Sequence, residues 1–377
     1  MGAILAGGRV GLWAVIMITV FPAVRALAAP ACDTTIRVLL EARASGFSLE
    51  SGGHRHAFAL SRAGRLEVDG VDQETWRSQP GQAGHAGRRI PGVLSVVPIR
   101  GQIALIAELP LETYVAGVLM GEVPALWEAQ ALRAQAVVSR SYGLHQRGEN
   151  ARRAYHVEAN TRNQVFELGS PPAPLEGAVA ATRCEVLTWQ GAPILAAYHS
   201  ASGGRTASAR EVWGQDLSYL TSREVQGEEN SPDTYWRAAV SRTTMARALR
   251  GLGLDVGAVR SARISERSES GRVLELRFEG TRGETVLSGG ELRSALGEST
   301  LKSTLFELSA ENERFLFVGS GRGHGVGMSQ WGAQGMAQRG AHYTEILRTF
   351  YPGTKLKRWG RHFGENEFGD GEAFAGR

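Results

Sequence analysis

Cysteine is nearly absent from this sequence, in which Cys32 and Cys184 are the only two. Two cysteines allow at most one disulfide, and in an oxidising compartment they could pair. Their separation along the chain does not decide between this bridge and two unpaired thiols, with Cys184 in a strand core. His54 and His56 lie close together in a turn-like SGGHRH segment but lack a third ligand, so we expect no metal there.

Lysine is almost as scarce, since Lys302, Lys355 and Lys357 are the only three, and the net charge of +4 comes mainly from arginine. No run of consecutive basic residues with interleaved aromatics marks a nucleic-acid surface, and we expect no nucleic-acid partner. The moderate positive charge favours no other partner either. Hydrophobic residues make up 42% and charged residues 21%, an ordinary globular composition in a chain long enough for two domains.

Long apolar runs are also lacking, except near the amino terminus. There Arg9 is followed by the apolar run Gly11–Val24 and then by Ala26-Leu27-Ala28, which resembles a secretory signal with an A-x-A cleavage site. We therefore expect residues 1–28 to be removed and the chain to be exported to the periplasm or cell wall. An uncleaved anchor is the alternative, although the run is short for a spanning helix. The three residues before Cys32 lack the aliphatic residue usual in a lipoprotein signal, which disfavours lipidation.

The rest of the sequence predicts an α+β fold with two lobes, because short β runs and helical patterns are interspersed. Glycine-rich turns separate apolar or alternating runs that predict a β-rich segment over residues 33–108: Thr35–Leu40, Phe47–Leu49, Ala57–Leu60, Leu66–Val68, Val93–Val97 and Ile103–Ala107. A core would follow over 109–240, an inserted α/β lobe over 241–310, and the rest of the core over 311–359. The glycine-rich tail, 360–377, is predicted to be disordered.

The stretch Leu109–Tyr142 carries the strongest local signal. Apolar side chains occur in it at the spacing of one buried helical face, at Leu111, Tyr114, Val115, Val118 and Leu119. That helix must stop near Gly121, because Pro124 cannot continue it and pushes Val123 towards extended dihedrals. A second helix is predicted from about residue 126 to 144. The two helices meet at Glu122.

Glu122 is placed where a carboxylic acid would tend to keep its proton. The negative end of the first helix and the apolar neighbours Val118, Leu119 and Val123 all disfavour the ionised form and should raise its pKa. A raised pKa suits a general acid. A solvated glutamate at a helix end is the alternative that position alone leaves open.

Two glycine-rich segments carry further candidate residues. A predicted strand, Ile194–His199, delivers His199 into the loop SASGG, where Ser200, Ser202 and the glycines would let a sugar approach the backbone closely. A Ser–His nucleophile is disfavoured because no G-x-S-x-G elbow occurs. Trp213 could offer an aromatic face to a sugar ring or could belong to the core.

The second segment is GRGHGVG at Gly321–Gly327. It fits neither G-x-G-x-x-G nor a loop followed by G-K-[ST], so phosphate binding is not expected. Ser329 can cap a helix that begins near Gln330. A glycine-lined loop that presents His324 and a helix start with Gln330 suits the binding of hydroxyl or acetamido groups.

Several motifs together resemble the SpoIID/LytB family. In order they are LPLETYVAGVLMGEVP, ALRAQAVVSRSY, YHSASGG, VWG and GRGHGVGMSQWGAQGMA, and the resemblance extends through SGRVLELRFEG, LSGGELRSALG and LKSTLF. By position, Glu122 resembles the catalytic acid and Arg140 the family's active-site arginine. The resemblance also places the loop Gly321–Gly327, the GHG loop, beside Glu122. We expect a glycan-binding groove at Glu122. The residues expected to line it are Gln135, Tyr142, His199, Ser200, Ser202, Trp213, His324 and Gln330.

The resemblance implies a lytic transglycosylase of peptidoglycan, which cleaves the MurNAc–GlcNAc bond without water or a cofactor and leaves 1,6-anhydro ends. LytB-like members instead imply a noncatalytic wall-binding enhancer of a cell-wall amidase. Glycan strands and such an amidase are therefore the expected partners. Some members carry cysteine and histidine zinc ligands in the segment matching Tyr155–Leu168, where only His156 could serve here, so a zinc hydrolase is disfavoured.

Overall fold

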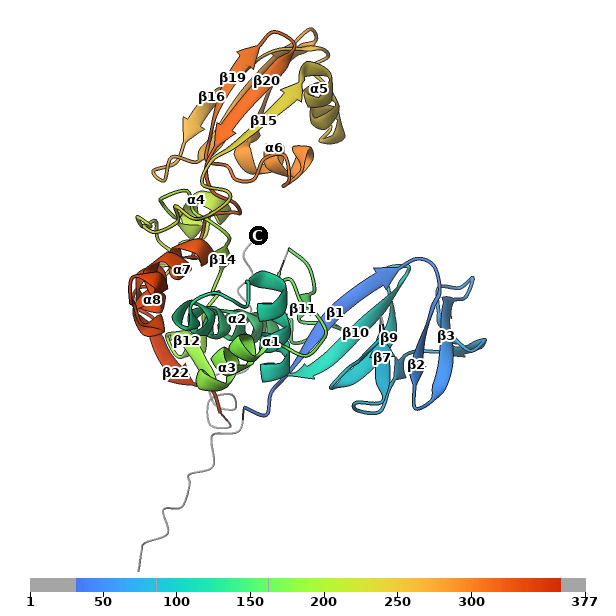
Figure 1. Cartoon of the computed structure of the whole chain (residues 1–377). Helices are drawn as coiled ribbons and strands as arrows, with labels where there is room; N and C mark the ends of the chain where they lie inside the picture. Colours follow the sequence, from blue (N-terminus) through green and yellow to red (C-terminus); the bar gives the residue numbers. More distant parts are fainter. Residues whose placement is uncertain (1–31, 86, 162, 361–377) are drawn as a thin grey trace, which may run out of the picture.

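The computed structural model describes residues 32–85, 87–161 and 163–360 (Figure 1). The expected signal peptide, and all but the first residue of the expected tail, lie outside the described residues. Within them the chain is a mixed α+β protein with eight helices and several small sheets. None of these helices combines the length and the apolar character needed to cross a bilayer.

The described chain starts with a β-rich region that ends where the first helix begins, and a short later strand, β11, joins one of its sheets. One sheet has five strands in the order β11-β1-β10-β9-β6, and a second has six in the order β5-β4-β3-β2-β7-β8. Their apolar residues face a common core, in which Ile36, Phe58 and Leu94 are almost fully buried. The strands are β1 Thr35–Arg43, β2 Phe47–Ser51, β3 His54–Leu60, β4 Leu66–Val68, β5 Val71–Gln73, β6 Trp76–Arg77, β7 Ala83–His85, β8 Arg88–Arg89, β9 Val93–Ile99, β10 Gln102–Pro110 and β11 Val157–Glu158.

Helix α1, Leu111–Glu122, continues directly from β10 and has the predicted apolar face. Its predicted apolar residues are all fully buried, which packs the helix onto the core. The helix ends one residue later than predicted, because Val123 before Pro124 has extended dihedrals of φ −136° and ψ 144°. Helix α2, Ala129–Glu149, begins three residues later than predicted.

Helix α2 is the centre of the main core. Every residue from Ala131 to Leu144 is buried except Arg133, so the helix is covered on nearly all sides. It contacts several elements that are distant in sequence, and Figure 1 shows them gathered around it. These are α3 Ala173–Ala181, β12 Glu185–Trp189, α7 Gln330–Gln338 and α8 Tyr343–Phe350.

A second hydrophobic core contains residues from Trp236 to Phe317 and is separate from the first. Its elements are β15 Trp236–Ser241, α5 Arg242–Gly251, β16 Val259–Arg267, β17 Val273–Gly280, β18 Gly283–Ser288, α6 Gly289–Leu296, β19 Phe306–Glu311 and β20 Arg314–Gly319. They form the sheets β15-β20-β19 and β16-β17-β18. We call these residues the 236–319 unit. It starts before and ends after the expected inserted lobe because β15 and β20 pair with each other.

The predicted strand Ile194–His199 is wrong over most of its length. Only β13, Ala192–Pro193, and β14, Tyr198–His199, are strands, and residues 194–197 between them are irregular. The reason is that the chain leaves one sheet for another: β13 pairs with β12, whereas β14 pairs in parallel with β21, Met328–Ser329. This crossing brings the segment before SASGG next to the segment after the GHG loop.

A disulfide joins Cys32 to Cys184, which decides between the two alternatives that the sequence left open. The carboxyl end of the described chain meets the same place. Trp359 donates its backbone N–H to the Cys184 carbonyl at 2.8 Å and its indole N–H to the Thr34 hydroxyl at 3.1 Å. The last strand, β22 Lys355–Arg358, pairs with β12 just beside it. Both ends of the described chain are thus anchored to the start of β12.

Candidate active site

Glu122 lies in a cavity of about 440 Å³. Its walls come from the end of α1, from α2, from residues 161–165, from both glycine-rich loops, and from the 236–319 unit. The lining residues are Glu122, Tyr142, Thr161, Asn163, Val165, Leu195, Ala197, Tyr198, His199, Ser200, Trp213, Gln215, Arg293, Glu298, Arg322, Gly323, His324 and Gln330. Six of the eight residues expected to line a groove are therefore brought together with Glu122.

The Glu122 carboxylate is half-buried and is held by neutral donors. Its Oε1 accepts the backbone N–H of Val165 at 2.7 Å, and the Tyr198 hydroxyl also hydrogen-bonds to it. The amide of Gln330 lies 3.5 Å from Oε2, at the limit of a hydrogen bond. Burial raises the pKa of Glu122 above its ordinary value, and these hydrogen bonds only partly oppose the rise. No ion pair to Glu122 occurs among the described residues.

A chain of hydroxyl and amide groups fixes the donors around Glu122. The hydroxyl of Tyr114 donates to Gln164, whose amide donates to the Tyr198 hydroxyl at 3.2 Å. Asn163 donates to the hydroxyl of Tyr142 at 2.9 Å. Burial raises the pKa of Tyr198 well above its ordinary value, so this hydroxyl keeps its proton and can donate to Glu122.

No role was expected from the sequence for residues 163–165, although they hydrogen-bond to the acid and to three tyrosines. They lie within the segment inspected for zinc ligands. Their contacts run through a backbone N–H and two amide side chains, groups that carry no recognisable spacing in a sequence. His156 in the same segment has a structural role, because both of its ring nitrogens are within hydrogen-bond distance of Arg37, at 3.1 Å from the backbone N and 3.0 Å from Nε.

The GHG loop passes so close to the strand before SASGG that only glycine fits at key positions. Gly323 has φ of 105°, and an added Cβ would lie 2.8 Å from the Cβ of His199. Gly327, with φ of 73°, would place a Cβ against the Ala197 carbonyl. These left-handed conformations are energetically unfavourable for any residue that has a side chain. The glycines therefore bring His199 and His324 into one wall of the cavity.

His199 and His324 are both held in the neutral form. Burial lowers the pKa of His199 well below its ordinary value, and burial together with nearby arginines lowers the pKa of His324 to about 4. The Nδ1–H of His199 donates to the Val326 carbonyl at 3.1 Å, and Nδ1 of His324 accepts the Val326 N–H at 3.0 Å. His199 Nε2 is then an acceptor, and it is buried without a hydrogen-bond partner among the described residues.

Aromatic rings continue the same wall. The ring of His324 lies 5.6 Å from that of His199 and 5.2 Å from that of Trp213. Trp213 ends helix α4, Ala209–Trp213, and is 38% exposed, so part of its indole faces solvent rather than the core. A half-exposed indole beside neutral imidazoles is a surface on which a sugar ring can stack.

Two predicted groove residues lie elsewhere. Ser202 is fully buried, and its hydroxyl donates to Glu228 at 2.7 Å instead of facing the cavity. Gln135 is also buried and donates to Ser139 at 3.1 Å, one turn along α2. Both side chains make their hydrogen bonds within the protein, and neither residue lines the cavity.

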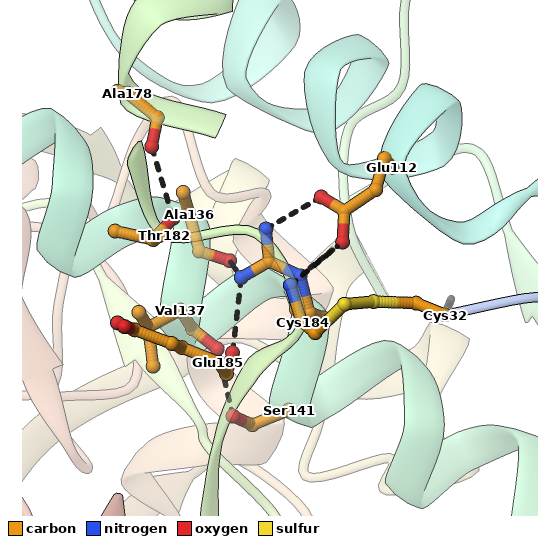
Figure 2. Close-up of polar contacts among 10 residues, drawn as sticks. Cys32, Glu112, Ala136, Val137, Ser141, Ala178, Thr182, Cys184 and Glu185 are labelled. Carbon is orange, nitrogen blue, oxygen red and sulfur yellow. Dashed lines mark hydrogen bonds and ion pairs between the residues drawn. A yellow bond between two sulfur atoms is a disulfide. The ribbon is translucent and has the colours of Figure 1, made fainter. Parts of the chain in front are cut away.

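Arg140 does not face Glu122, contrary to our expectation. Its guanidinium is fully buried and binds both carboxylate oxygens of Glu112, at 3.0 and 2.7 Å, and the Glu185 carbonyl at 3.0 Å. Figure 2 shows Glu112 and Glu185 beside the Cys32–Cys184 disulfide. Tyr142 faces the cavity and Arg140 faces away because two residues along a helix differ by about 200°. Arg140 is therefore part of the core.

Charged groups that the sequence did not indicate complete the cavity. Arg293 and Glu298 come from the 236–319 unit and form an ion pair at 3.1 Å, and Arg322 lies 3.7 Å from Asp233. A larger cavity of about 1020 Å³ lies beside β8 and the other face of α1. Its charged residues, Arg88, Arg89 and Glu167, are all exposed, so the Glu122 cavity is the better candidate site.

The described residues contain one group that could hold a metal by distance, namely Cys32, Glu112 and Cys184. Its two sulfurs form the disulfide, and its carboxylate binds Arg140. Thiolates are the species that bind zinc, so the oxidised pair is unsuited to it. The Glu122 cavity contains no such group of ligands among its described residues.

Comparison with known proteins identifies the family. A family model described as Stage II sporulation protein, SpoIID, matches residues 99–189, which include Glu122. The chain is 30% identical over 272 residues to Stage II sporulation protein D of Bacillus subtilis, covering 67% of this chain and 75% of that protein. The chain belongs to the SpoIID family. An uncharacterised protein from Brachyspira hyodysenteriae is also 30% identical, over 72% of this chain and 73% of its own length.

Two further matches add to this comparison. The amidase enhancer of Bacillus subtilis is 29% identical over 286 residues, 64% of this chain, but the match spans only 40% of that protein. A model for a domain of unknown function matches residues 212–327, a range that contains the 236–319 unit and His324. The cavity therefore combines residues from both matched regions.

Proposed function

We propose that this SpoIID-family protein is a lytic transglycosylase that cleaves the MurNAc–GlcNAc bond of peptidoglycan and leaves 1,6-anhydro ends. One observation carries the proposal: Glu122 is a half-buried carboxyl group in a cavity, it is contacted only by neutral donors, and burial raises its pKa. A carboxyl group in this environment can hold a proton at a pH where an ordinary glutamate has lost it. It is thus suited to protonate a leaving oxygen.

Glu122 would act twice in one reaction. The protonated carboxyl donates its proton to the glycosidic oxygen as the C1–O bond breaks and C1 of MurNAc becomes oxocarbenium-like. The resulting carboxylate then accepts the proton of the C6 hydroxyl while that oxygen bonds to C1 and closes the anhydro ring. Glu122 ends protonated, and no water is consumed. The hydroxyl of Tyr198 and the N–H of Val165 would stabilise the ionised intermediate form.

Hydrolysis would usually need a second carboxylate at the site. The other carboxylate that lines the cavity is Glu298, which is ion-paired with Arg293 and whose side chain is 57% exposed. Glu112, at the other end of α1, is bound to Arg140. Neither is held as a base beside Glu122, which favours a reaction in which the substrate supplies its own nucleophile.

The cavity wall that contains His199, His324 and Trp213 would bind the sugar. His199 Nε2 lacks a partner among the described residues and would accept a hydrogen bond from a hydroxyl or acetamido N–H. Trp213 and His324 would stack against a pyranose ring, and Gln330 would hydrogen-bond near the reacting centre. Peptidoglycan glycan strands are the substrate class that these groups fit best.

The Cys32–Cys184 disulfide supports export as the setting of this activity. Disulfides persist in oxidising compartments such as the periplasm and the cell exterior, where the glycan also lies. We propose that the chain reaches that compartment by means of the expected signal peptide.

A second candidate function is a noncatalytic enhancer of a cell-wall amidase. The similarity to a protein named amidase enhancer favours it, although that match spans 40% of that protein. In that case the cavity would bind glycan and present it to a partner enzyme, and Glu122 would contact the sugar without cleaving it.

Mass spectrometry of digested glycan strands separates these functions. We expect the parent protein to release 1,6-anhydro products and Glu122→Gln to release none. Glu128→Gln is the matched control, because this carboxyl lies six residues further, is exposed and makes no side-chain cap contact. Free reducing ends would indicate hydrolysis, and unchanged glycan with faster cleavage by an added amidase would indicate the enhancer.

A further inference from the structure

Arg272 is a buried cation that lies beneath both glycine-rich loops. It belongs to the 236–319 unit, directly before β17, and is 2% exposed. Its Nη2 donates to the Ser202 carbonyl at 2.8 Å and lies 3.3 Å from the Arg205 carbonyl. The guanidinium therefore binds the backbone of the SASGG loop without lining the cavity itself.

The same guanidinium supports the GHG loop. Gly325, with φ of 84°, lies so close to it that an added Cβ would collide with the guanidinium carbon. Gly325 also accepts the backbone N–H of Ala207 at 2.8 Å. One side chain from the 236–319 unit is thus in contact with the residue after His324 and with the loop after His199.

Neighbouring contacts tie the unit to the rest of this wall. Ser270, two residues before Arg272, donates to Glu211 of α4 at 2.7 Å, and α4 ends with Trp213. Glu228 accepts the Ser202 and Gly204 backbone N–H groups at 2.7 and 2.9 Å, as well as two serine hydroxyls. The carboxylate of Glu228 is therefore already saturated by the loops.

Arg272 is costly as a purely stabilising residue. Its Nε and Nη1 are buried and make no hydrogen bond with the described residues, and no ion pair to a carboxylate forms. Burial lowers the pKa of Arg272 to about 10, which reflects an unfavourable site for a charge. Apolar residues of similar size often stabilise such a site at least as well. The position of this residue calls for an explanation other than stability.

We propose that Arg272 is a positioning residue for the Glu122 cavity. It holds the SASGG and GHG loops so that His199 and His324 form the sugar-binding wall of this cavity. The effect on catalysis rests on the function proposed above. The 236–319 unit also supplies Arg293 and Glu298 to the cavity. The unit is accordingly a constituent of the active site, not an independent binding module.

The arrangement has an electrostatic signature that does not depend on activity. The pKa of His324 is lowered first by burial and then by Arg272 and Arg293, and the pKa of His199 by burial, His324 and Arg272. Glu211 and Glu228 are the carboxylates that act on Arg272 itself. Removal of the Arg272 charge should let His324 take up a proton at higher pH.

The test compares Arg272→Met and Arg272→Lys with Arg277→Met. Arg277 is the matched control, since it lies in β17 of the same unit, pairs with Glu284 and does not contact the loops. Glycan cleavage gives kcat and KM, and NMR gives the titration midpoint of the His324 imidazole, assigned by its loss in His324→Ala. Thermal unfolding checks the fold of each variant.

For Arg272→Met we expect kcat to fall roughly ten- to hundredfold, because displaced binding residues misorient the substrate. The titration midpoint of the His324 imidazole should move to higher pH. Arg272→Lys keeps the charge but cannot span Ser202 and Arg205, so kcat should fall while the midpoint stays nearer that of the parent. Arg277→Met should match the parent in both. If Arg272→Met does not fold, Arg272→Lys alone decides.

Unchanged kcat and an unchanged His324 midpoint in Arg272→Met, or unchanged kcat in Arg272→Lys, would overturn the proposal. If the parent protein does not cleave glycan, the proposed function fails, and the affinity of the same variants for glycan strands replaces kcat. In that case parent-like affinity and an unchanged midpoint in Arg272→Met would contradict the positioning role independently.

Discussion

Helix α1 has a glutamate at each end, and the two carboxylates have opposite environments. Glu112, in the first turn, binds the buried guanidinium of Arg140 through both oxygens and accepts the Cys184 N–H at 3.1 Å. Glu122, the last residue, has neutral donors and no ion pair among the described residues. The helix dipole favours a negative charge at the first position and disfavours it at the last.

The difference shows how one helix can carry a structural acid and a chemical acid. Glu112 forms an ion pair with Arg140 that compensates its charge, and it joins α1 to α2 and to the disulfide region (Figure 2). Glu122 lies where ionisation is opposed by burial, so its proton is available for transfer. Three experiments test this contrast and a fourth tests the cavity wall near Glu122, in order of decreasing expected effect.

Glu122→Gln should lower glycan cleavage by about 10²- to 10⁴-fold, the usual contribution of a general acid, while glycan binding persists. The change should also stabilise the fold at neutral pH. The raised pKa of Glu122 means that its contribution to stability is complete below the unfolded pKa and lost as pH rises through the folded pKa. Urea unfolding at acidic and neutral pH measures this difference. A variant less stable than the parent at neutral pH would contradict the assigned environment.

Arg140→Met should destabilise the protein by about 3–5 kcal/mol, because it leaves Glu112 without its partner in a largely buried site. Activity per folded molecule should be unchanged. The control is the double variant Glu112→Leu/Arg140→Met, which should recover part of the loss, since no charge is then left unpaired. Chemical unfolding of the two variants checks this. A stable Arg140→Met protein without activity would restore Arg140 to the site.

The pH dependence of cleavage should follow the protonated form of Glu122. Because burial raises its pKa, activity should persist above the ordinary range of glutamate and fall as pH rises through the shifted value. The hydroxyl of Tyr198 opposes that shift, so Tyr198→Phe should move the falling limb to still higher pH. Kinetic pH profiles of both proteins measure the limb. Identical profiles would show that this hydroxyl does not act on Glu122.

The sequence predicted the features that depend on local periodicity. The apolar face of α1, its end before Pro124 and the meeting of two helices at Glu122 follow from residue spacing and proline geometry. The direction in which the Arg140 side chain points could not be predicted. Helix α2 is buried on nearly all sides, so no exposed polar face shows which elements pack against which of its residues. Whether Cys32 and Cys184 form a disulfide was likewise undetermined, since spacing along the chain says nothing of distance in space.

The site beyond Glu122 was only partly predictable for a related reason. His324 and Gln330 could be proposed from the glycine-rich motif and the family resemblance, and they line the cavity. Val165 contributes a backbone N–H and Arg272 a buried charge from a different region. Neither contact depends on a pattern within its own segment, so only the three-dimensional arrangement reveals it.

His324→Ala should have the smallest effect. His324 lines the same cavity as the acid but makes no hydrogen bond to Glu122, so we expect weaker glycan binding with the proton transfer retained. Because it is half-buried at a cavity wall, the free energy of unfolding should change by no more than about 1 kcal/mol. Binding is best measured in the inactive Glu122→Gln background. The control is His54→Ala, an exposed histidine in β3. Equal affinity of the His324 and His54 variants would remove the GHG loop from sugar binding and leave the contrast between Glu112 and Glu122 unaffected.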